Sequence, residues 1–301
     1  MTAVPGTSRR LVLADGRALH YRTAGSGSPT VVLEAGMGCS LAGWAAVVPG
    51  LAEQTTVVAY DRAGYGQSDP DPQPRTLPRL AADLLALLEH LDDRRVVLVG
   101  HSWGGPVIRT ALASRPDLIA GAVLCDPSDE DMELFHTRAA ARQRRWMVKA
   151  LPTMRRLGLV ELGVKASTKG LPPAVAAEMA TTDSTARHVA AMQAELAAFE
   201  DDVAQLRARP LPVPEAPVTI ITGVKETRKL LPGTGDAARN AVLAANERRA
   251  ASYPHGRHVS AFGSTHYVPF TEPELVATEA LALVDAARAE EPTRSTTEDP
   301  R

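Results

Sequence analysis

The chain has 301 residues, of which 45% are hydrophobic, and a formal net charge of -2 at pH 7. This composition supplies a sizeable apolar core, and the balanced charge gives no reason to expect nucleic acid as a partner. Residues 1–10 contain no apolar run typical of a signal peptide, and no stretch approaches the length of a membrane span. We therefore expect a cytoplasmic protein with no membrane partner.

Cys39 and Cys125 are the only two cysteines, and the eight histidines show no spacing typical of metal ligands. We expect two buried thiols, no metal and no cofactor.

Strands and helices alternate along the first part of the chain. Two short apolar segments on either side of Asp15-Gly16 predict an opening hairpin. The alternation that follows predicts a mostly parallel sheet with helices on both faces, which is the α/β class. The expected strands are Thr30–Glu34, Thr55–Tyr60, Val96–Val99, Ile119–Cys125, Val218–Thr222 and His258–Phe262, and the expected helices are Leu41–Glu53, Leu77–Leu91, Pro106–Ser114 and Glu272–Arg288.

The alternation stops between Ser128 and about Pro214, where helix-forming residues dominate and prolines such as Pro152 divide the runs. We expect a core made of residues 1–127 and 215–289, a helical cap at 128–214, and a disordered tail at 290–301. Ligands of open parallel sheets bind at the carboxyl ends of the strands. A cap laid over that edge would exclude water and shape a substrate pocket.

The motif Gly-x-Ser-x-Gly stands at the end of one expected strand, in Gly100-His101-Ser102-Trp103-Gly104. A helix is expected directly after it. A turn this tight needs small flanking residues, and it holds the serine hydroxyl clear of the sheet at a helix N-terminus. We therefore take Ser102 as the candidate nucleophile.

Four segments together resemble the α/β-hydrolase family, over about Leu11 to Arg288. They are Glu34-Ala35-Gly36-Met37-Gly38, the stretch from Tyr60 to Ser68, Gly100 to Gly105, and Gly263-Ser264-Thr265-His266-Tyr267. The resemblance implies an α/β-hydrolase fold with an inserted helical cap.

A serine hydroxyl needs a neighbouring base to act as a nucleophile at neutral pH. His266 is the candidate, because it follows the last expected strand and returns to the same sheet edge as Ser102. His255 and His258 lie at the opposite end of that strand, and His101 adjoins the serine but points elsewhere.

The resemblance implies a carboxylate as the third group, after the nucleophile and before the histidine. Asp126 ends the strand that follows the nucleophile helix, and Glu226 ends the next core strand. We favour Asp126, since an aspartate at a strand end needs no adjustment of loop length, and keep Glu226 as the alternative.

In relatives, two backbone N–H groups stabilise the oxyanion of the reaction. The resemblance places them here at Met37 and Trp103. It implies a serine hydrolase that cleaves an ester through an acyl-enzyme, and the methionines of the cap suggest a small-molecule substrate of apolar character. Other acyl-transfer reactions on the same triad (lactonase, amidase, aminopeptidase or perhydrolase), a lyase, and a ligand-binding module remain alternatives. A serine at this position argues against relatives that open epoxides or displace halide, because those use aspartate. The oligomeric state is left open.

Overall fold

An eight-stranded sheet forms the centre of the protein, in the strand order β1-β2-β4-β3-β5-β6-β7-β8. The computed structural model describes residues 4–93, 95–168, 171–225 and 235–290. The first two strands form the predicted hairpin, β2 runs antiparallel to β4, and all other neighbours are parallel. The strands are β1 (Thr7–Val12), β2 (Ala18–Ala24), β3 (Val31–Glu34), β4 (Val57–Tyr60), β5 (Val96–His101), β6 (Ile119–Cys125), β7 (Val218–Gly223) and β8 (Gly256–Ala261).

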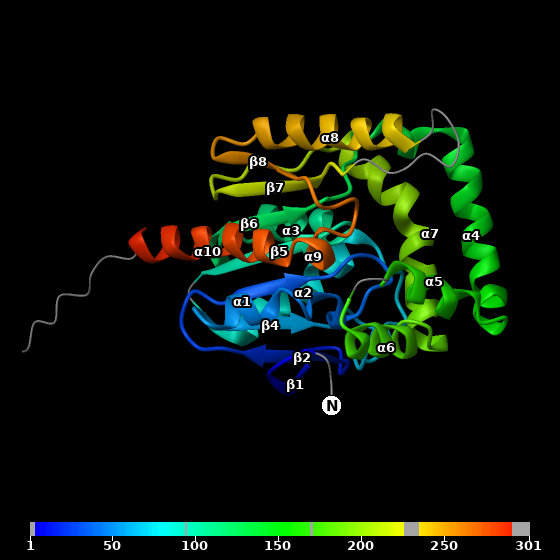
Figure 1. The fold of residues 1–301 in the computed structure, drawn as a ribbon, viewed down its shortest axis with the longest axis horizontal. Coiled ribbons are helices and arrows are strands. Elements are labelled where there is room, and N and C mark those ends of the chain that lie inside the picture. Colours follow the sequence, from blue (N-terminus) through cyan, green and yellow to red (C-terminus); the bar gives the residue numbers. More distant parts are fainter. Residues whose placement is uncertain (1–3, 94, 169–170, 226–234, 291–301) are drawn as a thin grey trace, which may run out of the picture.

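Helices cover both faces of this sheet, as the alternation of strands and helices predicts (Figure 1). Helices α2, α3 and α8 pack on one face, and α1 and α10 pack on the other. Their bounds are α1 (Val48–Ala52), α2 (Leu77–Leu91), α3 (Gly104–Ser114), α8 (Gly235–Ala251) and α10 (Pro273–Glu290), and the short α9 (Val268–Thr271) precedes α10.

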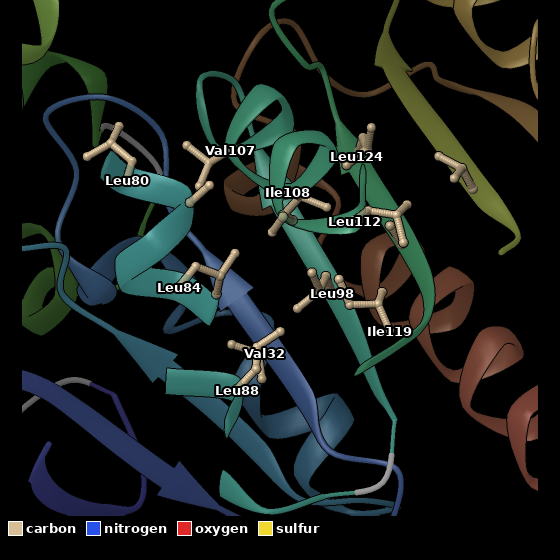
Figure 2. Close-up of a cluster of buried hydrophobic side chains, with 14 of the residues drawn as sticks. Val32, Leu80, Leu84, Leu88, Leu98, Val107, Ile108, Leu112, Ile119 and Leu124 are labelled. Atoms are coloured by element: carbon tan, nitrogen blue, oxygen red, sulfur yellow. The ribbon is translucent and has the colours of Figure 1, made fainter. Parts of the chain in front are cut away.

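The core beneath α2 and α3 consists of aliphatic side chains from both helices and from the central strands (Figure 2). Leu84 and Leu88 of α2 point toward Val32 of β3, and Ile108 of α3 lies over Leu98 of β5. The helical spacing of the leucines in α2 brings their side chains to one face of the helix. The central strands are buried on both of their faces. This packing fixes the central strands, whose carboxyl ends carry the site described below.

The chain between β6 and β7 is helical in its described residues. It contains η3 (Glu133–His136), α4 (Arg138–Arg156), α5 (Leu159–Ser167), α6 (Pro173–Thr182) and α7 (Ala186–Ala208). Helix α4 packs along α7, and α6 packs on the short 3-10 helix η1 (Leu41–Trp44) at the carboxyl edge of the sheet. In Figure 1 these helices lie together at one end of the sheet. None of the described helices is long and apolar enough to cross a membrane.

The structure corrects several of the expected elements. The segment Leu41–Glu53 is two short helices, η1 and α1, rather than one continuous helix. Pro152 lies inside α4, and the break comes instead at Gly158, which has a φ of 71° that suits glycine. Helix α8 was not expected, although its alanine-rich sequence favours a helix. Glu290 ends α10 rather than beginning a tail, and residues 291–301 lie outside the described part of the chain.

A buried ion network joins α7 to the sheet. Arg62, in the loop after β4, bonds to Glu34 at the end of β3 and to Glu195 of α7, whose Oε2 lies 3.0 Å from Nη2. Arg75 donates to the other oxygen of Glu195 at 2.8 Å. All four side chains are buried, so each charge depends on the others for compensation. The network therefore sets the position of α7 over the carboxyl edge of the sheet.

We expect Glu195→Ala to lower the free energy of unfolding by about 3–5 kcal/mol, because Arg75 then loses its buried carboxylate partner and Arg62 keeps one carboxylate, that of Glu34. Urea denaturation measures this loss. Glu200→Ala is the matched control on the same helix, since its half-buried carboxylate pairs with Arg144 and Arg145 at 3.3 Å and its loss should cost less than about 1 kcal/mol. Equal losses in the two variants would contradict this account of the network.

Candidate active site

Ser102 lies on a sharp turn between β5 and α3, where its backbone is left-handed with a φ of 53°. A Cβ on Gly104 would come within 2.6 Å of the carbonyl oxygen of Glu34, and one on Gly100 would come within 2.6 Å of Ile108. Neither position can therefore hold a larger residue without movement of its surroundings. The Gly-x-Ser-x-Gly spacing follows from this crowding.

His266 and Asp126 form a hydrogen-bonded chain with Ser102. The distance from His266 Nε2 to Ser102 Oγ is 3.0 Å, and that from His266 Nδ1 to Asp126 Oδ2 is 2.6 Å. An ionised carboxylate only accepts, so Nδ1 donates to Asp126 and Nε2 is left to accept from the serine hydroxyl. The structure thus brings together three of the residues that the sequence singles out.

Asp126 occupies a tightly held position at the end of β6. Its backbone N–H donates to Ile221 O at 2.6 Å, and the N–H of Gly223 donates to its Oδ1 at 3.2 Å. The guanidinium of Arg239, on α8, binds both carboxylate oxygens, with Nη1 at 3.0 Å from Oδ2. Burial opposes ionisation, but the hydrogen bonds from His266 and Arg239 hold the pKa of Asp126 below its usual range.

His101 lies closer to the site than the sequence suggested. Its Nε2 donates to the carbonyl oxygen of His266 at 2.9 Å, and the two ring centroids are 4.8 Å apart. Burial lowers the pKa of His101 to about 3, so the ring is neutral. The expectation that His101 points elsewhere was wrong, and this side chain supports the backbone that carries His266.

Arg62 braces the loop after β3. It donates to the carbonyl oxygens of Ala35 at 2.6 Å and Gly36 at 2.9 Å. Among the described residues, the backbone N–H groups of Met37 and Trp103 have no hydrogen-bond acceptor. They are the two donors that the resemblance implies, and their assignment to an oxyanion remains a prediction.

A cavity of about 150 Å³ opens beside the serine. Its walls come from the loop after β3, from the turn that carries His266, and from helices α5, α6 and α9. The lining combines apolar and polar side chains, and Asp183 is the one carboxylate among the lining side chains of the described residues. The cavity is lined by Gly36, Met37, Gly38, Cys39, His101, Ser102, Val164, Ser167, Met179, Asp183, His266, Tyr267 and Phe270.

Glu226, the alternative acid, lies outside the described residues. Within the described part of the chain, no cluster of three or more histidine, cysteine, aspartate or glutamate side chains could hold a metal ion. His258 donates to or accepts from Thr222 Oγ1 at 3.0 Å, away from the serine.

A sequence model of the α/β hydrolase fold matches residues 29–158. The solved structure of a hydrolase from Pseudomonas aeruginosa has a TM-score of 0.69 and 27% identity, over 92% of this chain and 98% of its own. This chain has the α/β-hydrolase fold.

Curated relatives of this chain carry different names. The chain is 37% identical over 114 residues to a soluble epoxide hydrolase of a Corynebacterium species, covering 38% of this chain and 40% of the relative. It is 28% identical to a haloalkane dehalogenase of Mesorhizobium japonicum, over 78% of this chain and 70% of the relative. The matches to the first curated relatives span between 30% and 42% of their length. The names of these two relatives give different reactions.

Two side chains of this α/β-hydrolase site were missed by the sequence analysis, namely Arg239 and Asp183. Arg239 lies on α8, a helix that the sequence did not predict, so its contact with Asp126 was not predicted either. Asp183 directly follows α6 in the helical insert, and nothing in the sequence distinguishes it from the other acidic residues of that segment. Neither has a motif around it, and only the fold brings each one to the site.

Ser102 should react more slowly with a fluorophosphonate at acidic pH. We expect Arg239→Met to move this acidic limb of the pH–rate profile to higher pH by about one unit. The Arg239 cation favours the ionised carboxylate of Asp126, so its removal lets the Asp126–His266 pair take up a proton at higher pH. The measurement is the labelling rate between pH 4 and 9. Arg239→Lys keeps the charge and should leave the limb within a few tenths of a unit, and an unmoved limb in the methionine variant would exclude this effect.

Proposed function

We propose that this α/β-hydrolase is a serine esterase that cleaves a small carboxylic ester through an acyl-enzyme. The observation that supports this proposal most directly is the chain of hydrogen bonds from Asp126 through His266 to Ser102 at one wall of the cavity. The base is within hydrogen-bond distance of both the nucleophile and the group that orients it, as nucleophilic catalysis requires.

In the first half of the proposed reaction, Ser102 Oγ attacks the ester carbonyl while His266 Nε2 takes the hydroxyl proton. The resulting imidazolium keeps its Nδ1–H bond to Asp126, whose ionisation Arg239 favours. The N–H groups of Met37 and Trp103 stabilise the oxyanion, and Arg62 holds the carbonyls of Ala35 and Gly36 so that this loop does not reorganise. His266 then returns the proton to the leaving alcohol.

In the second half, a water molecule reaches the acyl-enzyme from the open side of the site. The imidazole of His266 is 43% exposed, so its ring can accept a proton from that water. Attack of the water on the acyl carbon forms a second tetrahedral intermediate, and its collapse releases the acid and restores Ser102.

The names of the relatives suggest other reactions, which the serine disfavours. Members of the family that open epoxides or displace halide use an aspartate at the position that Ser102 takes here. Attack of the serine hydroxyl on an epoxide carbon would form an ether, which water does not hydrolyse. Attack on an acyl carbonyl gives an ester that His266 can help to hydrolyse, and this favours an ester substrate.

We expect Asp126→Asn to reduce kcat for an aryl ester by on the order of 10³–10⁴-fold, because the amide no longer holds the imidazole in the required tautomer. Ser102→Ala should abolish both turnover and labelling by a fluorophosphonate. Glu226→Gln serves as the control and should leave kcat within about threefold. Thermal unfolding of each variant shows whether the fold is kept, and a large loss in Glu226→Gln with none in Asp126→Asn would reverse the assignment of the acid.

Product analysis separates an esterase from a lyase or a binding module. An esterase releases one acid and one alcohol per ester consumed, and stopped turnover should leave an acyl group on Ser102. A folded protein that consumes no ester from an acyl series between acetate and decanoate, and that does not react with the fluorophosphonate, would contradict the proposal.

A further inference from the structure

Helix α4 presents an exposed face that carries cations and no carboxylate. The helix contains no acidic residue, whereas arginine and lysine recur along its whole length. Its exposed cations are Arg138, Arg142, Arg145, Lys149 and Arg156. Among the described residues, the one carboxylate within ion-pair distance of this set is Glu200, at 3.3 Å from Arg145. The exposed face of α4 therefore carries positive charge that the described carboxylates largely leave uncompensated.

Large apolar side chains are exposed beside these cations. Trp146 is 59% exposed and Leu157 is 68% exposed. They are about three helical turns apart, so they lie on the same face of α4, about 16 Å from each other along its axis. Arg142 and Lys149 are about one turn before and one turn after Trp146, so the cations flank the indole on this face.

The apolar side chains continue past the end of α4. Gly158 turns the chain into α5, where Leu159 and Leu162 are also exposed. In Figure 1, α4 lies at the outer edge of the molecule, and its inner side packs along α7. We call the exposed surface of these two helices the α4–α5 patch, which consists of Arg138, Arg142, Arg145, Trp146, Lys149, Arg156, Leu157, Leu159 and Leu162.

We propose that the α4–α5 patch binds the surface of an anionic lipid bilayer. Its cations attract anionic headgroups, its indole lies at the level of the headgroups, and its leucines enter the boundary of the acyl chains. The sequence analysis expected no membrane partner because no segment is long enough to span a bilayer. A helix that lies along the interface needs no such span.

The charge and the shape of the patch favour a bilayer over other occupants. A second copy of the chain, seated on the same patch about a two-fold axis, would bring the cations of both copies face to face. A nucleic acid would pair with the cations and stack on Trp146, but it would leave the exposed leucines without apolar partners. An anionic bilayer complements the cations and the leucines together.

The patch lies close to the active-site cavity. Helix α5 lines that cavity with Val164 and Ser167, and Leu162 lies on the opposite side of the same helix. A bilayer in contact with Leu162 is therefore about one helix diameter, on the order of 10 Å, from the cavity wall. Binding to the bilayer does not require the proposed esterase reaction, so the two are tested separately.

Partition of the full chain onto sucrose-loaded vesicles tests the proposal. Vesicles of phosphatidylcholine that contain phosphatidylglycerol should bind the protein about tenfold or more better than vesicles of phosphatidylcholine alone, and added NaCl should reduce the difference. Tryptophan emission gives a second readout, because Trp44 and Trp103 are buried and Trp146 is the exposed one of the three tryptophans. Its emission should move to shorter wavelength on binding, and brominated lipid should quench it.

Charge reversal on the patch should weaken this binding. The double variant Arg142→Glu, Lys149→Glu should lower the partition onto anionic vesicles by about tenfold or more, since each cation beside such a surface contributes about fivefold. The matched control is Arg9→Glu, Arg248→Glu, which changes the net charge equally at exposed positions on β1 and α8 and should stay within about twofold of wild type. Trp146→Ala should weaken binding and abolish the quenching by brominated lipid.

Thermal unfolding should be unchanged in all of these variants, because the substituted side chains are exposed. The charge variant and the tryptophan variant alter different residues, so either one carries the test if the other fails to fold. Equal binding of wild type to neutral and anionic vesicles, or equal losses in the two double variants, would overturn the inference. A dimer that Trp146→Ala dissociates, or retention of nucleic acid, without any binding to vesicles would also overturn it. Each of these results leaves the esterase in place, which turnover of a water-soluble aryl ester tests by itself.

Discussion

The backbone hydrogen bonds of the parallel ladder are the interaction on which the site depends. Their register pairs His101 with Cys125 and Cys125 with Ile221, so β5 and β6 end at one level and β7 runs two residues beyond it. The ladder continues past the strands, since Ser102 donates to Cys125 O at 3.0 Å and Asp126 to Ile221 O at 2.6 Å. Residues more than twenty positions apart in the chain are thereby held side by side, and the loop after β8 adds His266 at the same edge.

Charges buried under the helical insert serve both the fold and the site. Arg62 bonds to Glu34 and Glu195, and it also holds the carbonyls of the loop that carries Met37. A movement of α7 would therefore be transmitted to that loop through the guanidinium of Arg62. These paired charges position the insert over the sheet.

Sequence patterns predicted the elements with a strong local signal and missed those decided by context. The leucine spacing of Leu77–Leu91 predicted α2 with its observed bounds. The helix expected at Leu41–Glu53 is divided, because its two parts pack on different elements. The first part, η1, packs against α6 and α9, and the second part, α1, packs against α10 and β4. Pro152 did not end α4, since packing along α7 maintains that helix despite the missing N–H. Tertiary contacts outweigh local preference in both cases.

The sequence by itself determined the α/β class, the turn at Ser102 and the candidate base His266, because glycine spacing and strand order are local properties that the chain carries wherever it folds. Only the tertiary structure decided the surroundings of the base. It brought Asp126 to 2.6 Å from His266 and set Arg239 of α8 on the same carboxylate. These contacts join residues that are 113 and 140 positions apart, and their distances depend on the packing of whole helices, which no short pattern encodes.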